Sequence, residues 1–287
     1  MVDSIASMHL EGYTALRLRI DGGVAFATID HPPINLFDLT LITEIDRLGR
    51  EIAEDPDVRV LVIDSANPEF FIAHADVKLI LGLPREPQPP PTELVGFQAV
   101  VDRFRTMPTV TIAVIEGRTR GGGSELVLAM DMRFAARGRA LLAQPEVAVG
   151  IIPGGGGTQR LPRLVWRARA LEIVLGCEDI DAELAEHWGY VNRALDPEEL
   201  RPFVDALARR IASFPADAVA HAKAAISAAE ADIVPGLLQE AHRFAQTLAG
   251  DETIARMERF LELGGQTPEF ERDGIKADEL ARTETSR

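Results

Sequence analysis

The sequence contains a single cysteine, Cys177, among its 287 residues. One thiol excludes an intrachain disulfide framework and a cysteine-rich metal site, so we expect no metal and a cytoplasmic protein. No run approaches the 18 or so consecutive apolar residues that a membrane-spanning helix needs. The first residues contain neither a basic segment nor a long apolar one. We therefore expect no membrane association and no signal peptide.

Basic residues are also scarce relative to acidic ones. The chain has 30 Lys and Arg against 45 Asp and Glu, which gives a formal net charge of −15. This acidic balance disfavours general binding to nucleic acid, and we predict no nucleic-acid partner. The hydrophobic content of 46% and the charged content of 26% are those of an ordinary globular protein. A chain of this length can form one large core with a small appendage.

Apolar runs predict the first elements of the fold. A hairpin is expected over 15–20 and 24–30, because two apolar runs flank an Asp-Gly-Gly turn. Apolar residues recur at helical spacing over 41–52, which predicts a helix. The short apolar runs at 58–64 and 110–115 predict buried strands.

The later elements alternate in the same way and then become mostly helical. This order predicts an α/β core with a helical appendage that begins near residue 200. The polar tail after Gly264 is expected to be loosely ordered. The individual expectations are a short helix over 73–81, a loop with five prolines over 84–91, a helix over 95–104, a helix opened by 121–123, strands over 132–136 and 140–142, and helices around 203–211, 218–229 and 254–263.

Two glutamates are each set in a glycine-punctuated segment. Glu125 follows Gly121–Gly123, whereas Glu146 follows Pro145 and precedes Gly154–Gly157. Two positioned carboxylates can share acid and base work on one substrate. Glycine turns leave backbone N–H groups free to face a developing negative charge. Taken singly, either glutamate also fits a helix terminus or a surface turn.

Three ordered motifs resemble the crotonase superfamily, the enoyl-CoA hydratase/isomerase family. They are Phe-Ile-Ala-His-Ala-Asp-Val-Lys at 71–78, Gly-Gly-Gly-Ser-Glu-Leu at 121–126, and Gln-Pro-Glu at 144–146 followed by the glycine loop at 154–161. The similarity covers roughly residues 14–265. It implies an α/β fold, a spiral of βαβ units with a CoA-thioester site over 1–200, followed by a C-terminal helical trimerisation region over 201–287.

The resemblance also implies the roles of individual residues. The backbone N–H groups of Ala75 and Gly122 would form an oxyanion hole, and Glu125 and Glu146 would be the catalytic pair. No cofactor is implied beyond the coenzyme A that the substrate itself carries. The implied substrate-binding residues are Ala73, His74, Asp76, Val77, Lys78, Gly121, Pro145 and Gly154.

Two residues depart from the family pattern. His74 stands where glycine is common, and we expect it to be a pocket wall or a satisfied structural histidine rather than an acid or base. Arg120 stands where a small or apolar residue is usual. It fits a substrate carboxylate or phosphate and a salt bridge equally well. Asp76 and Lys78 fit contacts to the nucleotide end of CoA, and also an ordinary solvated pair.

The resemblance favours hydration of the 2,3-double bond of an acyl-CoA thioester, with Glu125 activating water and Glu146 as the acid. Isomerisation, thioester hydrolysis and C–C cleavage in the same site remain alternatives, as does a non-catalytic acyl-CoA-binding protein. A homotrimer or hexamer is expected. We attribute its contacts to apolar residues of the helical third that exceed what a small appendage buries, namely Phe244, Leu248, Met257, Phe260 and Leu261.

Overall fold

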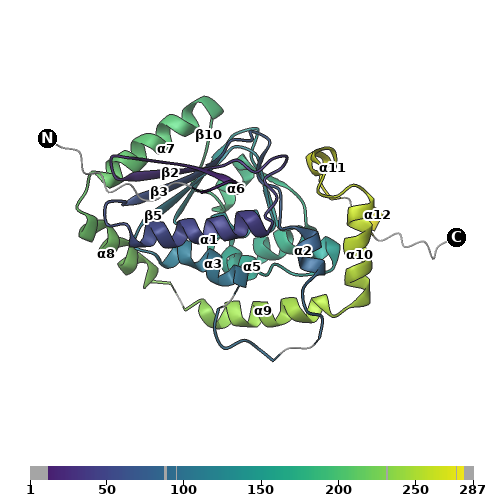
Figure 1. Cartoon of the computed structure of the whole chain (residues 1–287). Coiled ribbons are helices and arrows are strands. Elements are labelled where there is room, and N and C mark those ends of the chain that lie inside the picture. The colour runs from purple at the N-terminus through teal and green to yellow at the C-terminus, as the bar shows by residue number, and fades with distance from the viewer. Residues whose placement is uncertain (1–11, 87–88, 95, 231, 276, 281–287) are drawn as a thin grey trace.

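The computed structural model describes residues 12–86, 89–94, 96–230, 232–275 and 277–280. Within these residues the strands form one six-stranded and one four-stranded sheet, and helices surround them (Figure 1). No helix in this part of the chain has both the length and the apolar composition to cross a membrane.

The element bounds follow the expected alternation of strands and helices. The strands are β1 (Leu16–Asp21), β2 (Val24–Ile29), β3 (Val60–Ser65), β4 (Phe70–Ile72), β5 (Val110–Ile115), β6 (Arg118–Arg120), β7 (Met132–Ala136), β8 (Leu141–Ala143), β9 (Ile180–Asp181) and β10 (Arg193–Leu195). The helices are α1 (Leu39–Glu54), α2 (Val77–Leu81), α3 (Gly96–Thr106), α4 (Gly122–Ala129), α5 (Gly157–Gly176), α6 (Ala182–Trp188), α7 (Pro197–Ala212), α8 (Ala216–Ser227), α9 (Val234–Leu248), α10 (Asp251–Glu262), α11 (Pro268–Asp273) and α12 (Ala277–Leu280).

The chain visits the two sheets alternately. The large sheet has the order β1-β2-β3-β5-β7-β10, and the small sheet has the order β4-β6-β8-β9. In the three repeats β3–β4, β5–β6 and β7–β8, one strand joins the large sheet, the next joins the small sheet, and a helix follows. Neighbouring strands are parallel except in the pairs β1–β2 and β8–β9. The repeats therefore stack as a spiral, which confirms the expected fold class.

Helices cover both faces of the large sheet, so its central strands are apolar on both sides. Val60 and Val62 of β3 face α7, where they join one buried cluster with Val204. Leu61 and Ile63 point the other way and join a second cluster that includes residues of α1. This alternation explains why the continuous apolar runs predicted β3 and β5 correctly.

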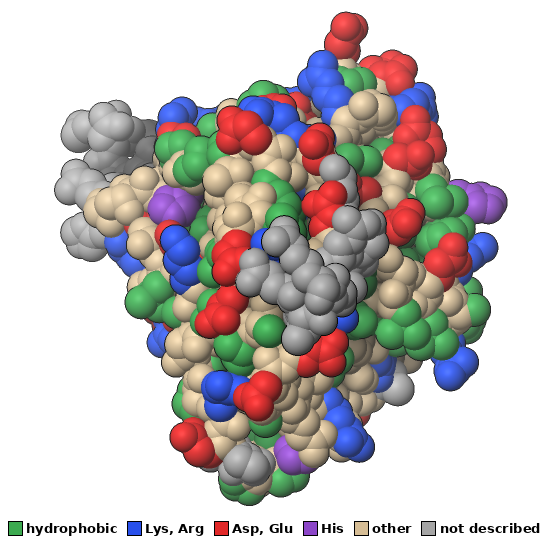
Figure 2. All heavy atoms as spheres, turned by 90° about the vertical axis from the view of Figure 1, so that its right-hand side faces the viewer, with side chains coloured by type: hydrophobic (Ala, Val, Ile, Leu, Met, Phe, Trp, Pro, Cys, Tyr) green, Lys and Arg blue, Asp and Glu red, His purple; other side chains and the backbone are tan. Residues whose placement is uncertain are grey.

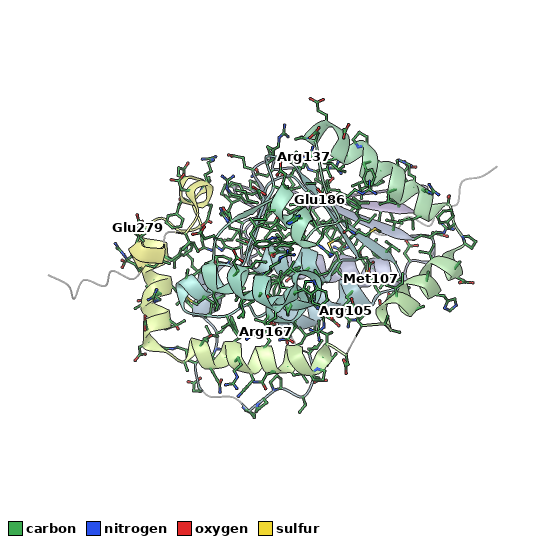
Figure 3. The ribbon with its side chains drawn as sticks, turned by 180° about the vertical axis from the view of Figure 1, so that it is seen from behind. Arg105, Met107, Arg137, Arg167, Glu186 and Glu279 are labelled. Carbon is green, nitrogen blue, oxygen red and sulfur yellow. The ribbon has the colours of Figure 1, made fainter. Side chains whose placement is uncertain are left out.

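The C-terminal helices return onto the core. α9 packs against α5, and Arg167 of α5 lies just above α9 in the view from behind (Figure 3). α10, α11 and α12 gather at one end of the molecule, beyond α2 (Figure 1). Met257 and Phe260 of α10 are buried there in a cluster that includes Val77 and Val149. Acidic side chains are scattered over much of this end (Figure 2).

Two expectations about the C-terminal third were wrong. The described tail after Gly264 is not loose, because α11 and α12 form there and Glu271 and Leu280 are only 1% exposed. The apolar side chains that we attributed to subunit contacts are covered within the chain itself. Leu248, Met257 and Phe260 are buried, and Phe244 and Leu261 pack half-buried against the same cluster.

The sequence pattern did not predict β4, β6 or α9. β4 and β6 have three residues each, too few to show a period, and α9 begins with a Pro-Gly pair that reads as a turn. The helix expected over 73–81 begins only at Val77, because Asp76 is extended and caps it. The expected division near residue 200 falls inside α7 and stays a prediction.

Candidate active site

The three motifs meet because they follow three neighbouring strands of the small sheet. Residues 73–76 follow β4, residues 121–122 follow β6, and residues 144–146 follow β8. β4 pairs with β6 and β6 pairs with β8, both in parallel. Parallel strands end at the same edge of a sheet, so segments about 25–50 residues apart converge there, as in other open parallel sheets.

Backbone bonds fix the segment that contains Ala75. The Phe37 N–H donates to His74 O at 2.9 Å, and the Asp76 N–H donates to Phe37 O at 3.2 Å. These bonds orient the two peptide groups that flank Ala75. Asn35 supports the same region, since its amide nitrogen donates to Phe70 O and Phe71 O at 3.0 Å each. Asn35 has a φ of 50°, a left-handed conformation that asparagine tolerates better than most residues.

Glycine is needed in the segment that contains Gly122. Gly121 has φ 50° and ψ −124°, which a residue with a Cβ rarely adopts, and its carbonyl accepts from the Glu125 N–H at 2.9 Å. Gly122 is the first residue of α4, so its N–H has no acceptor within the helix. A Cβ on Gly122 would lie 3.4 Å from the Cβ of Ala75. Ala75 and Gly122, which supply the two proposed N–H donors, are therefore in contact in space.

Glu125 belongs to α4, and its side chain is buried against the glycine turn at which α5 begins. Its Oε1 accepts from the Gly155 N–H at 2.7 Å and from the Gly157 N–H at 2.8 Å. The N–H group between these two in the chain, that of Gly156, donates instead to Glu240 of α9 at 2.7 Å. The N–H groups of this glycine turn therefore hold carboxylates of the protein, whereas we expected them to be free for a substrate.

Glu146 begins a short 3₁₀ helix and is 9% exposed. Gln144 lies against it, and the side-chain network places the amide nitrogen of Gln144 at 3.0 Å and 3.1 Å from the two carboxylate oxygens. In that orientation the amide oxygen accepts from Ser124 Oγ at 2.9 Å. Ser124 Oγ in turn shares a hydrogen bond with the buried Tyr190 hydroxyl. This relay fixes the orientation of the Glu146 carboxyl group.

Burial shifts both carboxyl groups toward their protonated forms. It raises the pKa of Glu146 to about 8. The pKa of Glu125 is also raised, first by burial and then by the charge of Glu146, while the N–H groups of Gly157 and Gly155 act in the opposite direction. Two such neighbours titrate as a pair. Near neutral pH the site therefore holds at least one carboxyl proton that exposed glutamates would have released.

A small cavity of about 40 Å³ lies against Glu146. Several predicted site residues line it, namely His74, Ala75, Val77, Gly121, Gly122, Pro145 and Glu146. Its apolar wall consists of residues that the sequence analysis missed, namely Ile80, Val149, Ile151, Phe260 and Ile275. Phe260 and Ile275 come from the C-terminal region, so α10 and the segment after α11 close the cavity.

The other predicted site residues, Glu125 among them, do not line this cavity. Ala73 is buried in a small cluster with Ile34 and Phe70. Asp76 caps α2, and Lys78 is exposed on that helix. Gly154 lies beside Phe244: a Cβ on Gly154 would come within 3.0 Å of its ring.

The two departures from the family pattern both form internal ion pairs. His74 Nε2 lies 3.0 Å from Glu271 Oε1. Arg120 donates two hydrogen bonds to Asp179, at 2.7 Å and 2.6 Å. His74 is thus the satisfied structural residue that we expected, and it also forms part of the cavity wall. Of the two alternatives for Arg120, the structure has the salt bridge. Periodicity does not indicate Glu271 or Glu240 as partners, because each contact depends on the return of the C-terminal helices.

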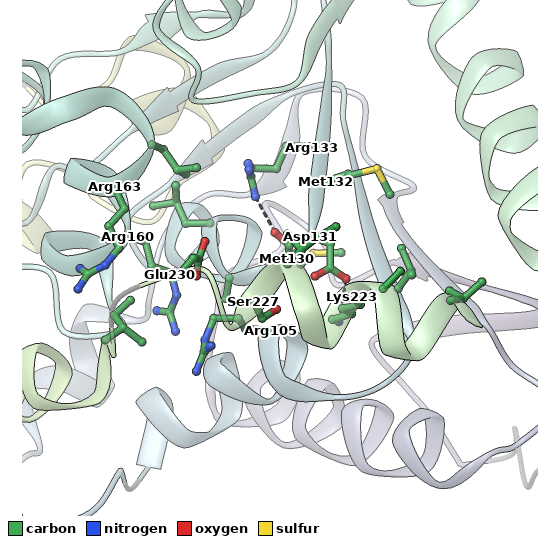
Figure 4. A pocket seen from close by; sticks show the side chains of 18 of the residues that line it. Arg105, Met130, Asp131, Met132, Arg133, Arg160, Arg163, Lys223, Ser227 and Glu230 are labelled. Atoms are coloured by element: carbon green, nitrogen blue, oxygen red, sulfur yellow. Dashed lines mark hydrogen bonds and ion pairs between the residues drawn. The ribbon is translucent and has the colours of Figure 1, made fainter. Parts of the chain in front are cut away.

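A larger cavity of about 440 Å³ lies elsewhere, between α8 and the ends of α4 and α5 (Figure 4). Its cationic side chains have partners within the protein. Arg133 donates to Met130 O at 2.6 Å and to Tyr190 O at 2.9 Å. Lys223 Nζ lies 2.8 Å from Asp131 Oδ2. Through these contacts the two cations stabilise the C-terminus of α4 and strand β5. Within the described residues, no group of three or more His, Cys, Asp or Glu side chains is arranged to hold a metal ion.

The raised pKa of Glu146 predicts a pH-dependent cost to folding. The unfolded chain ionises near the ordinary value of 4.5, whereas the folded protein keeps the proton up to about pH 8. Stability is therefore lost as the pH rises from 4.5 toward 8, by about 3 kcal/mol at pH 7 as an upper figure. Glu146→Gln should raise the melting temperature at pH 7, and the gain should shrink toward pH 4.5.

Calorimetry from pH 4.5 to 8 measures this gain. The exposed Glu172→Gln on α5 is the matched control, because its carboxylate stays in water and should give no pH-dependent gain. A Glu146→Gln gain that is equal at all pH values would contradict the assignment.

Comparison with known proteins identifies the family of the chain. The enoyl-CoA hydratase/isomerase family pattern matches residues 19–272. The crotonyl-CoA hydratase of Syntrophomonas wolfei is 34% identical over 256 residues, which span 87% of this chain and 96% of the relative. The short-chain-enoyl-CoA hydratase of Clostridium acetobutylicum is 31% identical over 249 residues, which span 85% and 94%.

A solved structure shows the same fold. The protein from Streptomyces avermitilis, assigned as an enoyl-CoA hydratase, superposes with a TM-score of 0.85 at 42% identity, covering 91% of this chain and 96% of its own. The sequence pattern, the relatives and the fold all agree over nearly the whole chain. The protein belongs to the enoyl-CoA hydratase/isomerase family.

Proposed function

We propose that the protein adds water across the 2,3-double bond of an acyl-CoA thioester. One observation carries the proposal: two buried carboxyl groups with raised pKa, and the closely packed residues Ala75 and Gly122, lie on segments that follow neighbouring parallel strands of one sheet. Hydration needs each part of this set, because negative charge develops on the thioester oxygen while one proton is removed from water and one is added to the α-carbon.

The Ala75 and Gly122 N–H groups would donate hydrogen bonds to the thioester oxygen and stabilise the enolate that forms during attack. A donor of this kind typically contributes about 100–1,000-fold in rate. Gly122 also stands at the beginning of α4, so the positive end of the helix dipole favours negative charge at the same place.

The two glutamates would divide the proton transfers. Glu125 is the proposed base, because two backbone N–H groups favour the ionised form that can take up a proton. It removes a proton from water as the oxygen bonds to the β-carbon. Glu146, protonated near neutral pH, gives its proton to the α-carbon as the double bond is lost. The substrate gains one water, and proton exchange between the carboxyl groups or with solvent restores the pair.

This chemistry takes place within the chain's own acid and base groups, so we propose that no metal or redox cofactor takes part. The acyl-CoA thioester is then the partner that the site recognises, and a cytoplasmic location agrees with the single cysteine. The acidic balance supports the absence of a nucleic-acid partner.

The cavity favours a short acyl group. Its volume of about 40 Å³ leaves room for only a small group beyond the thioester, and Val77, Phe260 and Ile275 are among the apolar residues that enclose it. Two of the relatives described above are named for crotonyl-CoA and short-chain enoyl-CoA. A short 2-enoyl-CoA is therefore the proposed substrate.

We also propose a trimer or a dimer of trimers, on different residues from those first expected. Trp166 on α5 is 76% exposed, Leu175 on the same helix is 61% exposed, and Ile226 on α8 is 72% exposed. None of the residues of α8 is buried in the single chain. Large apolar side chains exposed on a water-soluble domain often mark contacts between subunits.

Replacing either glutamate should remove hydration while leaving thioester binding nearly intact. Glu125→Gln and Glu146→Gln should each lower kcat by about 100–10,000-fold, the usual contribution of an acid or base group. Loss of the conjugated thioester absorbance measures the rate, and the exposed Glu172→Gln is the control. Near wild-type hydration by Glu125→Gln would refute the two-carboxylate mechanism. A parent enzyme that only shifts a double bond would indicate an isomerase.

The size of the cavity predicts that crotonyl-CoA is a better substrate than octenoyl-CoA. Ile275→Ala should raise the octenoyl-to-crotonyl ratio of kcat/KM by about 10-fold or more, because a pocket discriminates a few methylene groups by roughly this much. Leu184→Ala on α6, 37% exposed and outside the cavity wall, is the matched control. A wild-type preference for octenoyl-CoA would contradict the short-chain assignment.

The oligomeric state can be measured by light scattering on a sizing column. We expect a mass three or six times that of the 31.3 kDa chain. Ile226→Glu should shift the protein toward smaller species, because burying a charge in an apolar contact is costly. A parent protein that elutes as a single chain at micromolar concentration would contradict the proposal.

A further inference from the structure

The two residues that depart from the family pattern meet at one C-terminal residue, Glu271 of α11. The His74 ring contacts the Glu271 side chain, with Nε2 at 3.0 Å from Oε1. Arg120 contacts the backbone of the same residue, with Nη1 donating to Glu271 O at 2.7 Å. His74 directly precedes Ala75, and Arg120 stands two residues before Gly122. Glu271 is therefore bonded to both segments that supply the proposed N–H donors.

These contacts are sheltered from water and carry charge. Glu271 is 1% exposed, Arg120 3% and His74 6%. Glu271 raises the pKa of His74 against the opposing effect of burial, and His74 lowers the pKa of Glu271. The pair is thus favoured in its ionised form. Ion pairs and charge-assisted hydrogen bonds that are excluded from water hold their geometry more firmly than exposed ones.

Further bonds tie the same corner together. The second ring nitrogen of His74 lies 2.7 Å from Ala75 O. Glu271 Oε1 accepts from the Gln266 N–H at 2.9 Å, and the Gln266 amide donates to Asp76 Oδ1 at 2.8 Å. His74 and Asp76, the residues before and after Ala75 in the chain, are therefore both bonded to the C-terminal segment.

We propose that Glu271 is a positioning residue that sets the separation and direction of the Ala75 and Gly122 N–H donors. Its carboxylate holds the first loop through His74, and its carbonyl holds the second through Arg120. The two donors must lie about 3 Å from one oxygen, and small displacements weaken a preorganised site strongly. This role rests on the proposed function, since it concerns the same oxyanion hole.

A purely structural role for Glu271 would give different results. α11 has a second attachment to the core that does not involve either loop. Arg272 is paired with Glu69, with distances of 2.8 Å and 2.9 Å. If Glu271 served only to anchor the tail, its loss and the loss of Arg272 would have similar consequences. Arg272→Ala is therefore the matched control, and Glu269→Gln, an exposed carboxylate on the same helix, is a second one.

The experiment measures kcat, KM and the carbonyl stretch of a bound, unreactive acyl-CoA thioester. Glu271→Ala should lower kcat by about 10–100-fold, change thioester affinity less than threefold, and lose most of the downshift of the carbonyl frequency that wild type produces. Glu271→Gln keeps the shape and an acceptor for His74, so a smaller loss is expected. Arg272→Ala and Glu269→Gln should retain both kcat and the frequency shift.

The outcomes separate the proposals. An unchanged kcat and carbonyl shift in Glu271→Ala would overturn the positioning role. An equal loss of kcat in Arg272→Ala and Glu271→Ala would also overturn it. The same holds if wild type produces no shift of the thioester carbonyl frequency. If Glu271→Ala does not fold, as judged by circular dichroism, Glu271→Gln decides by the same criteria. The carbonyl shift needs thioester binding only, so it tests the donors even if the wild-type enzyme hydrates no enoyl-CoA.

Discussion

The parallel pairing of β4, β6 and β8 is the constraint on which the candidate site depends. Each strand has only three residues, yet the ends of all three lie at one edge of the small sheet. The large sheet supplies the buried apolar area that stabilises the fold, and each of these three strands is the next strand in the chain after one of its strands. The stable part of the molecule therefore fixes the position of the loops that carry the site.

A second requirement is that two carboxyl groups remain buried. An isolated buried carboxylate is strongly disfavoured, so the fold must supply hydrogen bonds to it. The beginning of α5 does so for Glu125, and Gln144 does so for Glu146. Glu240 takes the remaining N–H groups of the same turn. The glycine turn thus holds the acid and base groups in place, whereas the glycines at the start of α4 provide space beside Ala75.

The C-terminal region completes the site from the other side. Phe260 and Ile275 enclose the cavity, and Glu271 contacts His74 and Arg120 on the loops beneath. A short tail can remain ordered here because its polar groups are paired and its apolar groups are covered. The tail also explains why a histidine and an arginine are compatible with an otherwise apolar site: each one has a charged or carbonyl partner from α11 or from Asp179.

The sequence by itself determined the α/β class, the helices α1, α3, α7, α8 and α10, the strands of the large sheet except β10, and the residues of the three motifs, because burial on a helix or sheet face leaves a period in the chain. It indicated Ala75, Gly122, Glu125 and Glu146 through resemblance, and the structure brings their segments together. The sequence did not indicate β4 and β6, the order of the tail, or Glu240 and Glu271. β4 and β6 are too short to show a period, and the contacts of Glu240 and Glu271 join residues more than 80 positions apart. Such contacts have no local period, and only the packing of the C-terminal helices against the spiral decides them.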